Sequence, residues 1–117
     1  MEELEESPVI QTALKIILAA GDARTKANEA LDALADRDFM GAHSIIEEAR
    51  AFILKAHEAQ TSIIQAEAAG EHFNSCLMFN HAQDTLMTIM TEVNLADRII
   101  GLFEAFFGGE SNVSPAR

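Results

Sequence analysis

The chain has 117 residues, of which 49% are hydrophobic and only 6% aromatic, and its formal net charge is −11. Alanine accounts for 20 residues and proline occurs only at Pro8 and Pro115, so the composition favours helices and excludes an all-β domain and a disordered chain. The acidic charge makes nucleic acid and anionic membrane surfaces poor partners. A lone cysteine, Cys76, cannot form an internal disulfide, and this excludes a disulfide scaffold. With no signal-peptide pattern and no apolar run of roughly 20 residues, we expect a cytoplasmic protein without direct membrane insertion.

The first two predicted helices are bounded by clear capping residues. The first begins at Ser7-Pro8, because serine is a favoured N-cap and proline a favoured first helical residue, and it runs to about Ala35. Asp38 can cap the second helix, which Gly70 ends. Their apolar positions recur at helical spacing as Ile10, Ala13, Ile17, Ala20, Ala27, Leu31 and Leu34, and then as Ala42, Ile45, Ala49, Phe52, Ala56, Ala59, Ile63 and Ala66.

A third helix is predicted from Asn74 or Ser75 to about Phe107, where two glycines follow. The remaining residues 108–117 are polar and without periodicity, so we expect a disordered C-terminal tail. Residues 1–107 then form one all-α domain, an antiparallel up-down-up three-helix bundle.

The third helix carries apolar residues on two opposite sides. The second stripe lies about 200° around the helix from the first, and its C-terminal half is equally apolar. Because two neighbouring helices cannot cover both sides, we expect a homo-oligomer built on this helix. The first stripe is Phe79, Ala82, Leu86, Ile89, Val93, Ala96, Ile100, Phe103 and Phe107, and the second is His81, Asp84, Thr88, Thr91, Leu95, Ile99, Leu102 and Phe106.

Among the four histidines, His81 has the most suggestive neighbours. Asp84 and Thr88 follow it at i+3 and i+7, so all three share the face opposite the core stripe. An imidazole that is neutral at pH 7 can attack phosphorus, although a polar patch without chemistry is an equally open interpretation. For His43 and His57 on the second helix, a solvated or hydrogen-bonded histidine is the favoured interpretation.

Asp84 faces the same predicted oligomer seam. If a symmetry axis passes near it, identical carboxylates converge and either raise one another's pKa or recruit a hard cation such as Mg²⁺. A solvated helix aspartate is the commoner alternative.

These segments resemble the lactose/cellobiose-type IIA component of the bacterial sugar phosphotransferase system. The resemblance covers roughly residues 10 to 107 and is most specific in HAQDTLMT at 81–88. It is reinforced by GDAR at 21–24, ALDALADRDFMGA at 30–42, EARAFILKAHEAQTSIIQAEA at 48–68 and LADRIIGLFE at 95–104.

The resemblance implies a homotrimer of three-helix bundles that acts as a phosphotransferase component. The histidine matching His81 accepts a phosphoryl group from phospho-HPr and passes it to a cysteine of the IIB component. Gln83 matches a supporting polar position beside that histidine, and Asp84 matches an aspartate associated with a magnesium ion at the trimer centre. The family commonly has a second histidine where this chain has Thr85, a departure that leaves the nucleophile in place. Lactose, cellobiose and diacetylchitobiose are all compatible sugars.

Two other functions stay open at this point. A histidine-phosphotransfer domain of two-component signalling is also helical, but usually carries a basic residue and a glycine soon after its histidine, where this chain has Gln83 and Asp84. A non-enzymatic helical interaction module would trimerise without ever being phosphorylated.

Overall fold

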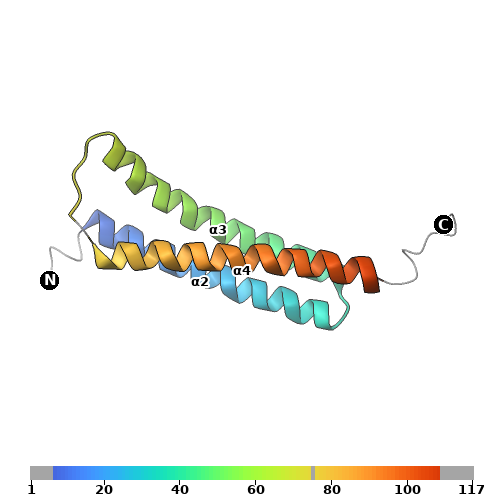
Figure 1. Ribbon diagram of the computed structural model, residues 1–117. Helices are drawn as coiled ribbons and strands as arrows, with labels where there is room; N and C mark the ends of the chain where they lie inside the picture. The colour runs from blue at the N-terminus through green and yellow to red at the C-terminus, as the bar shows by residue number, and fades with distance from the viewer. Residues whose placement is uncertain (1–6, 75, 109–117) are drawn as a thin grey trace.

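Three long helices account for nearly all of the described chain. The computed structural model describes residues 7–74 and 76–108, and these contain α2 (Pro8–Ala35), α3 (Phe39–Ala68) and α4 (Leu77–Phe107), with no strand among them. The helices run up, down and up in an elongated bundle of about 65 × 27 × 16 Å (Figure 1). The predicted all-α three-helix fold is therefore confirmed.

The first two helices begin at the predicted caps. The Ser7 hydroxyl accepts a hydrogen bond from the Ile10 backbone N–H, and the Asp38 carboxylate accepts one from Gly41 at 2.9 Å. After α3 ends at Ala68, Gly70 adopts φ 107°, a left-handed conformation that glycine takes without strain.

The predicted start of the third helix is two to three residues early. α4 begins at Leu77, and Cys76 is its N-cap, with Sγ accepting a hydrogen bond from the Phe79 N–H at 3.4 Å. Asn74 precedes the helix in the connector, while Ser75 and the predicted tail beyond Gly108 lie outside the described residues.

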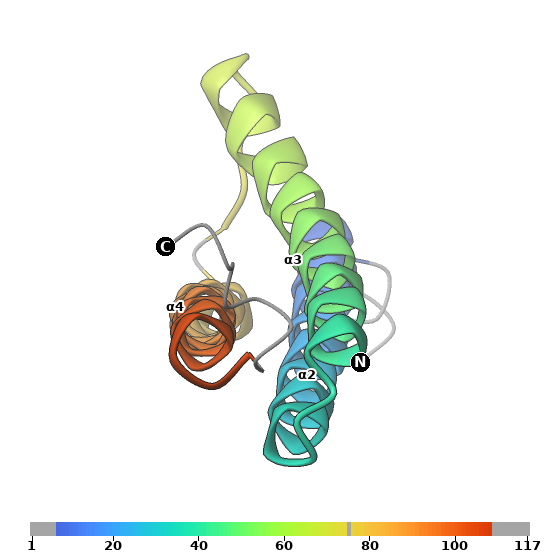
Figure 2. The same ribbon diagram turned by 90° about the vertical axis from the view of Figure 1, so that its right-hand side faces the viewer.

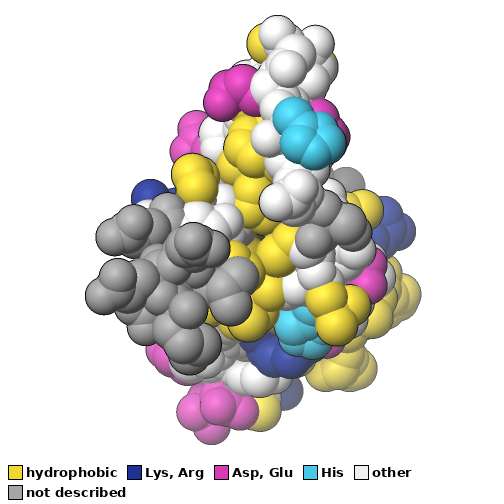
Figure 3. Space-filling model, turned by 90° about the vertical axis from the view of Figure 1, so that its left-hand side faces the viewer, with side chains coloured by type: hydrophobic (Ala, Val, Ile, Leu, Met, Phe, Trp, Pro, Cys, Tyr) yellow, Lys and Arg dark blue, Asp and Glu magenta, His cyan; other side chains and the backbone are white. Residues whose placement is uncertain are grey.

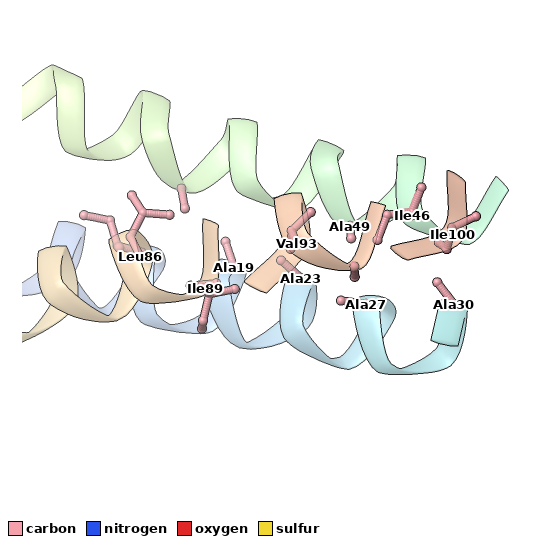
Figure 4. Packing of buried hydrophobic residues seen from close by; sticks show 14 of the residues in the cluster. Ala19, Ala23, Ala27, Ala30, Ile46, Ala49, Leu86, Ile89, Val93 and Ile100 are labelled. Carbon is pink, nitrogen blue, oxygen red and sulfur yellow. The ribbon is translucent and has the colours of Figure 1, made fainter. Parts of the chain in front are cut away.

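The core is a thin layer between α2 and the other two helices. Six alanines of α2 are buried, and their small side chains let α3 and α4 approach closely; those at 19, 23, 27 and 30 are labelled in Figure 4. Because α2 packs on both partners, its buried face is wider than one stripe: Ile16 is fully buried, whereas the predicted Ile17 is half-buried. The largest fully buried side chains are Ile16, Ile46, Leu86, Ile89, Val93 and Ile100.

The predicted core stripe of α4 is half-buried at Phe79, buried from Ala82 to Ile100 and exposed at its last two members. Phe103 and Phe107 stay exposed and pack on one another, with ring centroids 5.5 Å apart. The side chains of the turn at residues 36–38 are polar and exposed, and Arg37 Nη2 donates a hydrogen bond to the Phe107 backbone carbonyl at 2.6 Å.

α3 diverges from α4 toward the end of the bundle where α4 begins. Figure 1 and Figure 2 both show the last turns of α3 projecting away from α4. Contact between α3 and α4 is accordingly the sparsest of the three helix pairs. Within the described residues, no helix combines the length and the apolar character needed to span a membrane.

Candidate functional site

His81 lies in the second turn of α4, at the end of the bundle from which α3 projects. Its side chain is exposed, and together with the neighbouring Leu77 and Met78 it lines a shallow, open depression. Leu77 is 84% exposed and Met78 is 39% exposed, so two large apolar side chains face solvent beside the imidazole. Figure 3, which faces this end of the molecule, shows hydrophobic side chains in a continuous strip with histidine side chains along its edge.

The His81 imidazole has no hydrogen-bond or ion-pair partner in the described part of the chain, so both ring nitrogens are available. The other histidines differ in environment. On α3, His43 Nε2 lies 2.7 Å from Glu104 Oε1, as expected for a hydrogen-bonded helix histidine, and His57 is exposed. His72 is exposed in the connector. His81 combines an unpartnered ring with the exposed apolar side chains of Leu77 and Met78, which a protein could contact.

Gln83 lies on the opposite side of α4 from His81. Residues two positions apart in an α-helix are separated by about 200° around its axis. Gln83 is therefore directed toward α3, away from the side that carries His81. There its side-chain Oε1 accepts a hydrogen bond from Gln60 Nε2 at 3.0 Å. Gln60 is a buried polar residue that the helical apolar pattern alone does not single out.

Asp84 is exposed on the same side of α4 as His81. Its backbone carbonyl accepts a hydrogen bond from the Thr88 hydroxyl at 2.9 Å, while its carboxylate faces solvent. Within residues 7–74 and 76–108, no three His, Cys, Asp or Glu side chains come close enough to hold a metal ion. Thr85, at the family's second histidine position, is half-buried.

The second stripe of α4 is exposed over its apolar half. Leu95 is 57% exposed, Leu102 53% and Phe106 76%. Leu95 also lines a groove of about 260 Å³ between α2 and α4, with Leu31 and Ile99. In the polar half, the hydroxyls of Thr88 and Thr91 donate to backbone carbonyls one turn earlier. A largely apolar ridge therefore runs along α4 and is left exposed by the described residues of the chain.

Charged side chains link α4 to its neighbours over the half of the bundle farther from His81. Arg24 on α2 donates two hydrogen bonds of 2.8 Å to Glu92, one to each carboxylate oxygen. This hydrogen bonding and the adjacent positive charge lower the pKa of Glu92, and the same contact raises the pKa of Arg24. On the other flank, Arg50 of α3 binds Asp97 and the Asn94 amide oxygen.

The sequence of this chain matches a known protein family and several of its members. The family described as "PTS system, Lactose/Cellobiose specific IIA subunit" matches residues 11–104. The lactose-specific EIIA component of Staphylococcus epidermidis is 40% identical over 90 residues, which cover 77% of this chain and 86% of that protein.

Two solved structures share the fold. The cellobiose-specific enzyme IIA of Bacillus anthracis superposes with a TM-score of 0.79 at 34% identity, covering 86% of this chain and 92% of that one. The IIA(chitobiose) chain from the HPr complex of the Escherichia coli N,N'-diacetylchitobiose branch gives a TM-score of 0.73 at 30% identity, covering 84% of this chain and 95% of the other.

Proposed function

Since this chain belongs to the lactose/cellobiose-specific IIA family of phosphotransferase components, we propose that His81 carries a phosphoryl group between two partner proteins during sugar uptake. The observation that supports His81 is its exposed, unpartnered imidazole beside the exposed Leu77 and Met78. A carrier must be reached by its donor and by its acceptor, and a buried ring could be reached by neither. We place the reaction in the cytoplasm.

The proposed donor is phospho-HPr, and the proposed acceptor is a cysteine of the IIB component. In the first step, a neutral His81 nitrogen attacks phosphorus as the bond from phosphorus to HPr breaks. In the second step, the new N–P bond breaks as the IIB thiolate forms an S–P bond, which returns His81 to its starting state. Such transfers pass through a loose transition state, so positioning of the nucleophile is the main contribution of the protein. An E. coli relative solved in complex with HPr supports this donor.

We further propose that the chain acts as a homotrimer joined along the exposed ridge of α4. Covering the remaining surface of Leu95, Leu102 and Phe106 is favourable in water. Three copies would carry a formal charge of 3 × −11 = −33, so this apolar burial has to outweigh electrostatic repulsion.

Asp84 would then supply a magnesium site that one protomer lacks. Its carboxylate is exposed on the same side of α4 as the ridge, and carboxylate oxygens are the ligands that Mg²⁺ prefers. Three copies of Asp84 would hold the ion, which would offset the repulsion among these carboxylates.

Phosphate uptake by variants tests the assignment of His81. The chain is incubated with phosphoenolpyruvate, the general phosphotransferase proteins and HPr, and bound phosphate is counted. We expect one phosphate per wild-type chain and none for His81→Ala. His57→Ala is the matched control, because His57 is an exposed helix histidine away from the depression.

Three outcomes would contradict the proposal. Wild-type phosphate uptake by His81→Ala would refute the role of His81. A chain that trimerises but never takes up phosphate would be an interaction module. Phosphate accepted from a response regulator but not from HPr would indicate two-component signalling.

A further inference from the structure

We infer that Gln60 is a positioning residue for phosphoryl transfer, because its hydrogen bond to Gln83 fixes the rotation of the first turns of α4 and so the direction of His81. This inference rests on the proposed carrier function of His81. Gln60 itself lies on α3 and does not touch the imidazole.

Gln60 is the one buried polar or charged side chain among the described residues, with 8% of its surface exposed. A buried side-chain amide is unfavourable unless it is hydrogen-bonded, and Gln60 Nε2 donates to Gln83 Oε1 at 3.0 Å. Helix arrangements that separate these two amides are therefore disfavoured. A single buried polar pair can specify how two helices face each other in this way.

The Gln60–Gln83 pair lies at the end of the bundle where α3 and α4 make few other contacts. The other polar side-chain contacts between α3 and α4 in the described chain involve Arg50 and His43, in the half farther from His81. Toward the histidine end, α3 diverges and a cavity of about 190 Å³ opens, lined in part by Ile63, Phe79 and Gln83. Apolar packing between α3 and α4 is thus incomplete there, and the Gln60–Gln83 bond is the only polar contact between the two helices at that end within the described residues.

Because Gln83 and His81 lie on the same helix, the hydrogen bond that holds Gln83 toward α3 also determines the direction of His81. Gln83 and His81 are about 200° apart around α4, so a side chain held toward α3 at one position directs the other away from α3. Rotation or sliding of the first turns would move the imidazole relative to a docked phosphoryl donor. Misplacement of a reacting group by about 1 Å can slow a reaction by up to about 100-fold.

Three variants separate positioning from folding. Gln60→Leu keeps the size of the side chain and removes its hydrogen bond. Gln60→Glu keeps an oxygen that can accept from the Gln83 amide once that amide is turned over. Gln65→Leu is the matched control, an exposed glutamine on the same helix.

The measurements are the kcat and KM of phosphoryl transfer from phospho-HPr, the NMR signals of the His81 ring and the helical circular dichroism signal. For Gln60→Leu we expect about a 10-fold lower kcat, a KM changed less than about twofold, displaced His81 ring signals and wild-type helicity. Gln60→Glu should retain more of the kcat than Gln60→Leu, because its carboxyl oxygen can still accept a hydrogen bond from the Gln83 amide, and Gln65→Leu should match wild type.

A wild-type kcat for Gln60→Leu would overturn the inference. So would an equal loss in Gln60→Leu and Gln60→Glu that follows a loss of helicity, since Gln60 would then act only on folding. His81→Ala is run in the same assay, because phosphate uptake by that variant refutes the carrier function itself. That outcome is distinct from a failure of Gln60 alone.

Discussion

Truncation of Leu95 tests whether the exposed ridge of α4 joins subunits. Leu95 still exposes 57% of its side chain in the protomer. Full burial of a leucine contributes about 2 kcal/mol, so covering this remainder gives about 1 kcal/mol per copy and about 3 kcal/mol per trimer. Leu95→Ala removes most of that contribution and should lower the trimer association constant about 100-fold.

Sedimentation velocity across a micromolar concentration series measures this effect. Leu54→Ala is the matched control, because Leu54 on α3 is also 57% exposed and lies off the ridge. We expect Leu95→Ala to dissociate at concentrations where the wild type and Leu54→Ala remain assembled. A monomeric wild type at micromolar concentration, or equal dissociation of the two variants, would refute the assignment of the ridge as the subunit contact.

Two further predictions concern charge. Because Arg24 lowers the pKa of Glu92, their contact stabilises the fold at pH values above 4.5, the ordinary pKa of a glutamate side chain, and this stability is lost as the pH falls through the lowered value. The Tm gap between wild type and Arg24→Gln should therefore be present at pH 7 and shrink below about pH 4.5, with Lys55→Gln showing no such change. Added Mg²⁺ should raise the Tm of the wild type, and EDTA should remove this increase. The Tm of Asp84→Asn should respond to neither. An equal Mg²⁺ response in both proteins would exclude Asp84 as the ligand.

The ends of the helices were predictable wherever a residue acts through its own local geometry. Ser7 and Asp38 cap the helices that follow them, and Gly70 takes the left-handed conformation after α3. The start of α4 was not predictable, because its cap is Cys76, whose sulfur is an uncommon N-cap acceptor.

The sequence also predicted which face of α4 carries the candidate site. Helical spacing placed His81 and Asp84 opposite the buried stripe, and both are exposed. The Gln60–Gln83 bond could not be predicted in the same way, because it joins residues 23 positions apart and depends on how α3 packs on α4. Local patterns fix which way a side chain points from its own helix, whereas its partner on another helix is set by tertiary packing. The roles of His81, Gln83 and Asp84 stay predictions for the experiments above.

The open depression around His81 also has a kinetic consequence. The imidazole can be approached only from its exposed side, because the neighbouring Ala82 and Leu86 are buried behind it. A donor and an acceptor that both contact Leu77 and Met78 would compete for the same protomer, so each must leave before the other can bind. The rate of phosphoryl transfer from donor to acceptor would then depend on how quickly each partner dissociates, and small contact areas favour short residence times. Two exposed apolar side chains beside a free imidazole suit partners that meet, exchange and separate quickly.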